Sequence, residues 1–123
     1  MRMMIVDDSN MIRSRITRLV QNGMIGQVHV VAQAANGVEA LALATRHRPE
    51  LVTMDLTMPE MDGVECITKL LQMMPKTNIL VVSALTDKAT AIAALRQGAR
   101  GFVNKPFSDD ELRMALLELM DAT

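Results

Sequence analysis

Met3-Met4-Ile5-Val6 is a short apolar run that ends directly in two carboxylates, Asp7 and Asp8. Three further apolar runs also end in small polar or charged groups: Leu51-Val52-Thr53-Met54 precedes Asp55, Ile79-Leu80-Val81-Val82 precedes Ser83, and Gly101-Phe102-Val103-Asn104 precedes Lys105-Pro106. If these runs are neighbouring parallel strands, their polar ends lie together at one edge of a sheet, which is where open α/β folds bind ligands. We expect the functional site at this edge.

Helical patterns separate the apolar runs, so strands and helices alternate along the chain. The pattern predicts strands at residues 3–6, 28–34, 51–54, 79–82 and 101–104. It predicts helices over residues 10–22, from 37 to before Pro49, over 63–74 and over 87–97, and a last helix after residue 108. The signals for their ends are the caps Ser9 and Thr86, the stop at Gly98, and the capping box Ser108-Asp109-Asp110-Glu111 that opens the last helix. Strict alternation predicts an α/β fold with a doubly wound, five-stranded parallel sheet and helices on both faces. Periodicity leaves the strand order open.

Size and charge limit the classes of function. The 123 residues are enough for one domain, which we assign to residues 1–123, and the net charge of −1 provides no cationic field for nucleic acid or an anionic membrane. No apolar run approaches the roughly 20 residues of a membrane span, so we expect a cytoplasmic protein. Cys66 is the single cysteine and is expected to be an inert thiol on a helix, while the twelve methionines are expected to fill the core.

Three carboxylates are candidates for a metal site. An acidic pair such as Asp7-Asp8 is by itself more often part of a turn or a helix cap than a metal site, and the same holds for a single aspartate such as Asp55. Both groups follow strands expected to be buried, however, and adjacent buried carboxylates repel each other unless a cation neutralises them. Oxygen ligands with open coordination positions suit Mg²⁺, so we expect a weak, partly hydrated magnesium site.

Ser83 and Lys105 supply a hydroxyl and an ammonium beside the acids. Lys105 precedes Pro106, where a cis peptide would direct the ammonium back across the sheet edge. Metal, hydroxyl and ammonium could together hold three phosphoryl oxygens. Ser83 has no partner histidine and Cys66 lies outside this edge, so the nucleophile is one of the acids, and Asp55 is the best placed.

These motifs together resemble the response-regulator receiver domain. The resemblance extends over essentially the whole chain, and the motifs that carry it are Asp7-Asp8, Asp55 with Met58-Pro59-Glu60-Met61-Asp62-Gly63, Ser83-Ala84, Gly98-Ala99 and Lys105-Pro106-Phe107. It implies a flavodoxin-like sheet of order 2-1-3-4-5. Asp8-Ser9 followed by Arg13, with no output domain, is most similar to the stand-alone chemotaxis regulators of this family.

The resemblance also implies a role for each site residue. Asp55 would accept a phosphoryl group from a histidine kinase, and Mg²⁺ would be held by Asp8, Asp55 and the backbone carbonyl of Thr57, with Asp7 acting through water. Lys105 and Ser83 would bind the phosphate.

A conformational switch is implied as well. A shift of Ser83 would be coupled to rotation of Phe102, which remodels a face built from the fourth helix, fifth strand and fifth helix. A flagellar motor switch protein is the implied target, with a phosphatase as a further possible partner. The chain would be a phosphoacceptor that promotes its own phosphorylation and dephosphorylation, and not otherwise an enzyme.

Two positions depart from the common pattern of the family. Phe102 stands where many relatives have tyrosine, so it can rotate but cannot donate a hydroxyl hydrogen bond. Thr57 and Leu85 occupy variable positions that influence loss of the phosphoryl group, and apolar Leu85 could hinder an attacking water. We therefore expect a moderately long-lived phosphoform.

Several alternatives are weighed against this interpretation. A haloacid-dehalogenase-type phosphatase needs a carboxylate two residues after its nucleophile, where this chain has Thr57. A receiver that binds partners without phosphorylation, and a receiver cut from a larger regulator, stay open, although the start and end of the chain favour an autonomous protein. ATPase and DNA-binding readings have no support, since the chain has neither a GxxxxGK[ST] loop nor a basic recognition helix. The kinase, target, phosphatase and oligomeric state are not specified by the sequence.

Overall fold

The computed structural model describes residues 1–23, 25–84 and 88–121, so the predicted cap Thr86 and the flanking Leu85 lie outside the described residues. Strands and helices alternate through the chain. The strands are β1 (Arg2–Val6), β2 (His29–Ala34), β3 (Leu51–Met54), β4 (Asn78–Ser83) and β5 (Gly101–Asn104). The helices are α1 (Asn10–Gln21), α2 (Gly37–His47), α3 (Gly63–Met73), α4 (Lys88–Arg96) and α5 (Asp109–Asp121).

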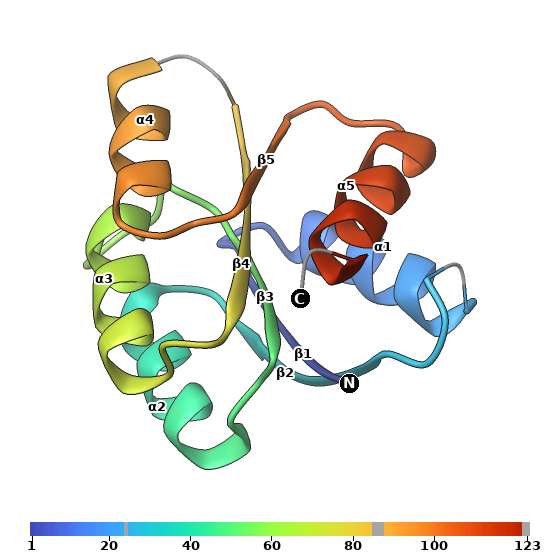
Figure 1. The fold of residues 1–123 in the computed structure, drawn as a ribbon, viewed down its shortest axis with the longest axis horizontal. Coiled ribbons are helices and arrows are strands. Elements are labelled where there is room, and N and C mark those ends of the chain that lie inside the picture. Colours follow the sequence, from blue (N-terminus) through green and yellow to red (C-terminus); the bar gives the residue numbers. More distant parts are fainter. Residues whose placement is uncertain (24, 85–87, 122–123) are drawn as a thin grey trace.

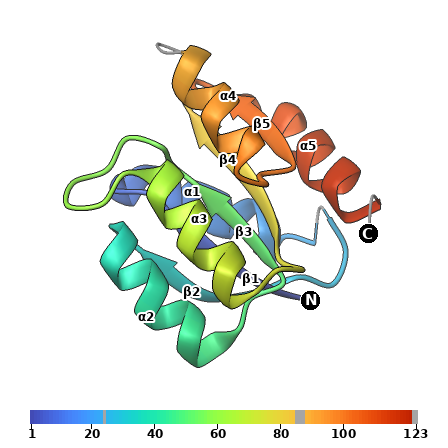
Figure 2. The ribbon, with the colours of Figure 1, turned by 60° about the vertical axis from the view of Figure 1, so that its left-hand side comes forward.

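The five strands form one parallel sheet in the order β2-β1-β3-β4-β5. Helices α1 and α5 cover one face of the sheet, and α2, α3 and α4 cover the other (Figure 1). The second view shows the same two layers of helices with the sheet between them (Figure 2). The predicted doubly wound fold, including the order 2-1-3-4-5 implied by the family resemblance, is confirmed.

The two faces of the sheet bury two separate apolar clusters. Alternate residues of each strand point to opposite faces, so Met4 and Met54 pack with α2 and α3, whereas Met3 and Leu51 pack with α1 and α5. Every residue of β4 is buried, as expected of a strand inside a parallel sheet. Met3, Met4, Met54 and Met74 are buried, as predicted for methionine as core filler, whereas Met1, Met11 and Met114 are exposed, so that prediction is confirmed only in part.

The predicted caps Ser9 and Ser108 precede helices α1 and α5, and three strands, β1, β2 and β4, begin one residue away from the predicted position. The capping box is confirmed in both directions, because Ser108 N–H donates to Glu111 Oε1 at 3.0 Å and Glu111 N–H donates to Ser108 Oγ at 3.1 Å. Strand β2 begins at His29 because Val28 N–H donates to Gly26 O in a turn, while His29 N–H donates to Met1 O.

Helix α3 ends one residue before the predicted end. Met74 precedes a proline, and the proline ring disfavours helical backbone in the residue before it. At the end of α4, Gly98 adopts a φ of +120°, and a Cβ at this position would lie 2.6 Å from Leu71 Cδ1. Glycine therefore fits this position both in backbone conformation and in space.

A search of the described residues for a helix with the length and apolar composition of a membrane span found none.

Candidate functional site

The sheet register places Asp7 and Asp55 beside each other. Val6 of β1 pairs with Met54 of β3, and the two aspartates are the next residues along these neighbouring strands. Asp55 N–H donates to Val6 O at 2.9 Å, which extends the ladder by one step. Both side chains therefore leave the carboxyl edge of the sheet on the face covered by α1 and α5.

Three carboxylates form an acidic cluster at this edge. One carboxylate oxygen each from Asp7, Asp8 and Asp55 lies within 4.8 Å of the other two. Asp7 and Asp55 are buried and Asp8 is exposed. Oxygen atoms at this spacing, open to water on one side, could hold a hard divalent ion.

Lys105 reaches into the acidic cluster from the end of β5. Its Nζ lies 2.7 Å from Asp7 Oδ2 and 3.7 Å from Asp55 Oδ2, and its side chain is 21% exposed. The Lys105–Pro106 peptide bond is cis, a geometry that is open to a residue before proline. By these distances the ammonium lies across the edge of the sheet, and its nearest partner is Asp7, a contact that the sequence did not predict.

Two hydrogen-bond donors meet the other oxygen of Asp55. Thr57 N–H donates to Asp55 Oδ1 at 3.1 Å, and the hydroxyl of buried Ser83 lies 3.5 Å from the same atom. The Thr57 residue itself is exposed. The structure thus brings Asp7, Asp8, Asp55, Ser83 and Lys105 together, with the Thr57 backbone beside them.

The surroundings of Asp55 raise the pKa of its carboxyl group from 3.8 to about 6. Burial is the largest cause because it removes water from the charged form, and the neighbouring carboxylates of Asp7 and Asp8 act in the same direction. The N–H of Thr57 and the ammonium of Lys105 act in the opposite direction without cancelling the effect. Asp55 is therefore a carboxylate whose negative charge is poorly compensated by the protein alone.

Phe102 lies on the same face of the sheet as Ser83. Ser83 pairs with Asn104 in β5, and Phe102 is two residues before Asn104, so the side chains of Ser83 and Phe102 share the face covered by α4. Phe102 is partly buried and also lines a pocket with Met114 and Ala115 of α5. Phe102 therefore belongs both to the face that carries Ser83 and to the lining of a pocket beside α5.

Two residues support the acidic cluster in ways that sequence reasoning missed. Arg13 Nη1 donates to Asp7 O at 2.6 Å, and the only sign of this contact in the sequence is an arginine six residues after Asp7. Gly63 packs so closely under Asp55 that a Cβ there would lie 2.4 Å from Asp55 O. Only glycine allows α3 to begin this close to the strand that carries Asp55.

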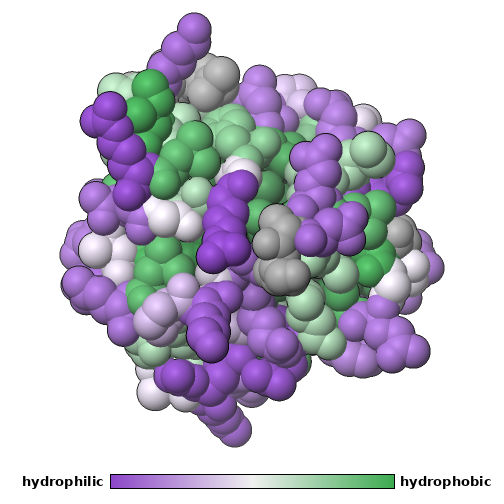
Figure 3. Space-filling view, viewed as in Figure 1, coloured by the Kyte–Doolittle hydropathy of each residue, from purple (hydrophilic) through white to green (hydrophobic). Residues whose placement is uncertain are grey.

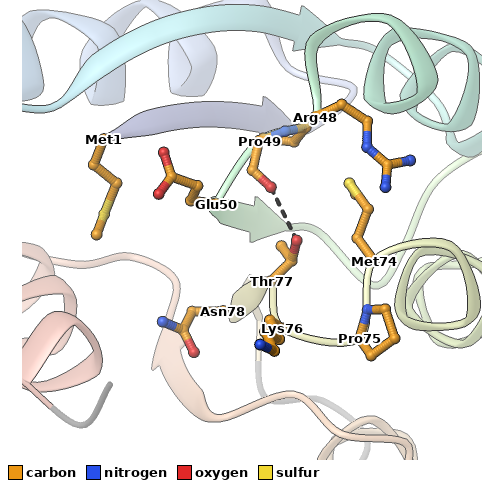
Figure 4. A pocket seen from close by; sticks show the side chains of 9 residues that line it. All are labelled: Met1, Arg48, Pro49, Glu50, Met74, Pro75, Lys76, Thr77 and Asn78. Carbon is orange, nitrogen blue, oxygen red and sulfur yellow. Dashed lines mark hydrogen bonds between the residues drawn. The ribbon is translucent and has the colours of Figure 1, made fainter.

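A pocket with a volume of about 500 Å³ opens at the opposite edge of the sheet, before the starts of β1, β3 and β4 (Figure 4). Thr77 Oγ1 donates to Pro49 O inside it at 2.9 Å. Its lining includes Arg48, Lys76 and Glu50, so both signs of charge are present, and it contains none of the predicted site residues. The site residues predicted from the sequence therefore lie away from this pocket.

Cys66 is placed away from the acidic cluster as well. It is fully buried in α3, and burial raises the pKa of its thiol to about 12. A thiol that does not ionise near neutral pH is a poor nucleophile, which supports the prediction of an inert cysteine.

Known proteins resemble this chain in both sequence and fold. The sequence profile described as "Response regulator receiver domain" matches residues 3–117. The chemotaxis protein CheY of Bacillus subtilis (strain 168) is 40% identical over 116 residues, which cover 94% of this chain and 93% of that protein. A protein-glutamate methylesterase/protein-glutamine glutaminase of Haloarcula marismortui is 38% identical over 119 residues, but these cover only 31% of that protein.

Among solved structures, the chain resembles one from the CheX–CheY–BeF3–Mg²⁺ complex of Borrelia burgdorferi. The TM-score is 0.89 at 26% identity, and the match covers 97% of this chain and 88% of that chain. The likeness therefore extends over the whole sheet and its helices.

The raised pKa of Asp55 predicts that its charge destabilises the fold when no metal is bound. The unfolded carboxyl ionises near 3.8 and the folded one near 6, so stability falls as pH rises through this window and stays low above it. In EDTA, Asp55→Asn should raise the free energy of unfolding at pH 7.5 by on the order of 2–3 kcal/mol, since each unit of pKa shift corresponds to about 1.4 kcal/mol. Urea denaturation followed by far-UV circular dichroism measures this difference.

The pH dependence separates this cause from a general packing effect. The advantage of Asp55→Asn should disappear as the pH approaches 4. Asp110→Asn, which removes an exposed carboxylate from α5, is the matched control and should have little effect at pH 7.5. An Asp55→Asn variant that is less stable than the wild type at pH 7.5 would contradict the assigned cause.

Proposed function

Because the chain belongs to the response regulator receiver domain family of two-component systems, we propose that it is a phosphorylation-activated signalling switch in which Asp55 accepts a phosphoryl group from a histidine kinase. The observation that carries this proposal is the group of side chains around Asp55: two further carboxylates, an ammonium and a hydroxyl lie together at one edge of the sheet. These groups match the needs of phosphoryl transfer, in which catalysis is mainly positioning and charge compensation.

Asp55 is the nucleophile of the proposed reaction. One of its carboxylate oxygens attacks the phosphorus of the phosphohistidine, an O–P bond forms, the P–N bond breaks, and the imidazole leaves with the bonding electron pair and takes up a proton. The product is an acyl phosphate on Asp55. Of the three acids, Asp55 is the one in reach of both Lys105 and Ser83.

The acidic cluster is proposed to hold Mg²⁺. Asp8, Asp55 and the carbonyl oxygen of Thr57 would be the ligands, with Asp7 acting through water, and the all-oxygen donor set fits this ion. When bound, Mg²⁺ neutralises the acidic cluster and the phosphoryl oxygens that would otherwise repel one another. The raised pKa of Asp55 supports the proposal, because the protein supplies too little positive charge of its own.

Lys105 and Ser83 are proposed to bind the remaining phosphoryl oxygens. The ammonium of Lys105 would move from Asp7 toward the added phosphate, a short displacement because it already lies 3.7 Å from Asp55 Oδ2. The hydroxyl of Ser83 would exchange its long contact with Asp55 Oδ1 for a hydrogen bond to the phosphate. In this account Phe102 rotates with the shift of Ser83, because both side chains occupy the same face of β4 and β5.

A partner is proposed to read the face formed by α4, β5 and α5. Large apolar side chains are exposed on the two helices of this face: Ile92 and Leu95 on α4 and Met114 on α5. The space-filling view shows hydrophobic surface over this part of the molecule, interrupted by hydrophilic side chains (Figure 3). Apolar surface with a polar surround is typical of a protein-binding site.

Chemotaxis is the favoured pathway, with a flagellar motor switch protein as the target and a phosphatase as a further partner. The support is the CheY of Bacillus subtilis, which matches this chain over nearly the full length of both proteins. The second candidate is a receiver domain attached to another domain. It is supported by the methylesterase, because the match covers less than a third of the length of that protein. We further propose a cytoplasmic location, and no catalysis beyond gain and loss of the phosphoryl group on Asp55. The expected moderately long lifetime of the phosphoform depends on Leu85 and stays a prediction.

Incubation with acetyl phosphate and Mg²⁺ should add one phosphoryl group to the intact protein, because the site itself supplies the nucleophile and the charge compensation. Intact-protein mass spectrometry measures this gain. EDTA should abolish it, and Asp55→Asn should abolish it in the presence of Mg²⁺. Asp110→Asn, a matched loss of a carboxylate outside the site, should retain the gain. No gain by the wild type, or a gain that survives Asp55→Asn, would favour a receiver that works without phosphorylation.

Binding to the purified flagellar motor switch protein of the same organism should strengthen when Asp55 carries a phosphate mimic. BeF3⁻ with Mg²⁺ is a suitable mimic, and isothermal titration calorimetry measures the affinity with and without it. Met114→Lys places a charge on exposed α5 and should weaken only the binding of the mimic-loaded form. Equal affinity in both states would exclude this protein as the target of the switch.

A further inference from the structure

Arg15 of α1 is bound to the chain segment that follows Lys105. Its Nη2 donates to Phe107 O at 2.7 Å and to Asp109 Oδ1 at 2.9 Å. Its guanidinium carbon also lies 4.4 Å from the centroid of the Phe107 ring, over its face. A single arginine therefore makes three different contacts within three residues of the chain.

The segment between β5 and α5 is held on both sides of Lys105. On the upstream side, Lys105 N–H donates to Ser83 O at 3.0 Å. On the downstream side, Phe107 is 4% exposed, and the side chain of Arg15 binds its carbonyl oxygen. The position of the Lys105 ammonium thus depends on a short segment with one anchor in β4 and the other in α1.

The same helix also holds the partner of Lys105. Arg13 donates to Asp7 O, two residues before Arg15 in α1. Two residues correspond to about 200° of rotation around a helix, so the two side chains leave α1 in nearly opposite directions. Helix α1 therefore connects the backbone that carries Asp7 with the segment that carries Lys105.

We propose that Arg15 is a positioning residue for Lys105, which keeps the ammonium within reach of Asp55 by fixing the 105–109 segment to α1. This inference rests on the proposed function, in which Lys105 compensates the charge of the phosphoryl group. Arginine suits the task because its planar guanidinium can stack on the ring of Phe107 while it donates to two acceptors. Lysine could keep the two hydrogen bonds but not the stacking.

The test is a double-mutant cycle on the rate of phosphorylation by acetyl phosphate at saturating Mg²⁺, followed by intact mass. Arg15→Ala should lower the rate roughly 10-fold, since small misplacement of a catalytic group is costly. Arg15→Lys, which can keep hydrogen bonds but loses the stacking on Phe107, should give a rate between those of Arg15→Ala and the wild type. In a Lys105→Ala background, Arg15→Ala should have no further effect. Arg18→Ala, which removes an exposed charge from the last turn of the same helix, is the matched control and should leave the rate unchanged.

A second measurement does not depend on phosphorylation. The chain has only four lysines, so ¹³Cε labelling of lysine gives a simple NMR spectrum in which Lys105→Arg identifies the signal of Lys105. Arg15→Ala should shift this signal and leave those of Lys69 and Lys76 in place, whereas Arg18→Ala should shift none of the three.

Each outcome decides a different question. A Lys105 signal unmoved by Arg15→Ala, or a rate loss of the same factor with and without Lys105, would overturn the positioning role. A wild-type protein that takes up no phosphoryl group would overturn the proposed function instead, while the NMR comparison would still test whether Arg15 places Lys105.

Discussion

Two buried carboxylates, Asp7 and Asp55, lie side by side at the ends of adjacent strands, and much of the surrounding structure compensates their charge. The ammonium of Lys105 lies 2.7 Å from Asp7, and the N–H groups of Ser9 and Thr57 each donate to one of the two aspartates. Compensation is incomplete, as the raised pKa of Asp55 shows. A site with unneutralised negative charge favours a cation, and the cation then allows an anionic phosphoryl group to approach. The proposed chemistry follows from this deficit of positive charge.

The sheet order explains how groups far apart in the sequence meet. With β1, β3, β4 and β5 adjacent and parallel, their carboxyl ends bring Asp7, Asp55, Ser83 and Lys105 to one edge. The ladder itself sets the spacing between the strands, while side chains on the flanking elements set the finer positions. Gly63 allows α3 to begin against Asp55, and Arg13 and Arg15 fasten α1 to the two chain segments that carry the Asp7–Lys105 ion pair. The same parallel register puts Ser83 and Phe102 on one face of the sheet, the face that α4 covers.

Much of this arrangement could be predicted from the sequence, because strong local signals carry it. The apolar runs with polar ends predicted the strands and the site edge, and the capping box at Ser108 predicted the start of α5. The strand order came from family resemblance, since a pattern of alternating elements is compatible with several orders. The Asp7–Lys105 ion pair and the contacts of Arg15 were not predicted. The two residues of the ion pair are 98 positions apart, and Arg15 is more than 90 positions from its partners. Such contacts depend on side-chain rotamers that no local sequence pattern encodes. The role of Leu85 lies outside the described residues.

We infer that the acidic cluster is an incompletely neutralised site for a divalent cation beside the proposed phosphoacceptor Asp55. It is tested most directly by titrating ¹⁵N-labelled protein with Mg²⁺ and following the amide signals by NMR. We expect saturable shifts at residues 7–9 and 55–57. We expect these shifts to be lost in Asp8→Asn, a change at an exposed side chain that leaves the buried pair intact. Shifts that do not saturate, or that persist unchanged in Asp8→Asn, would contradict it.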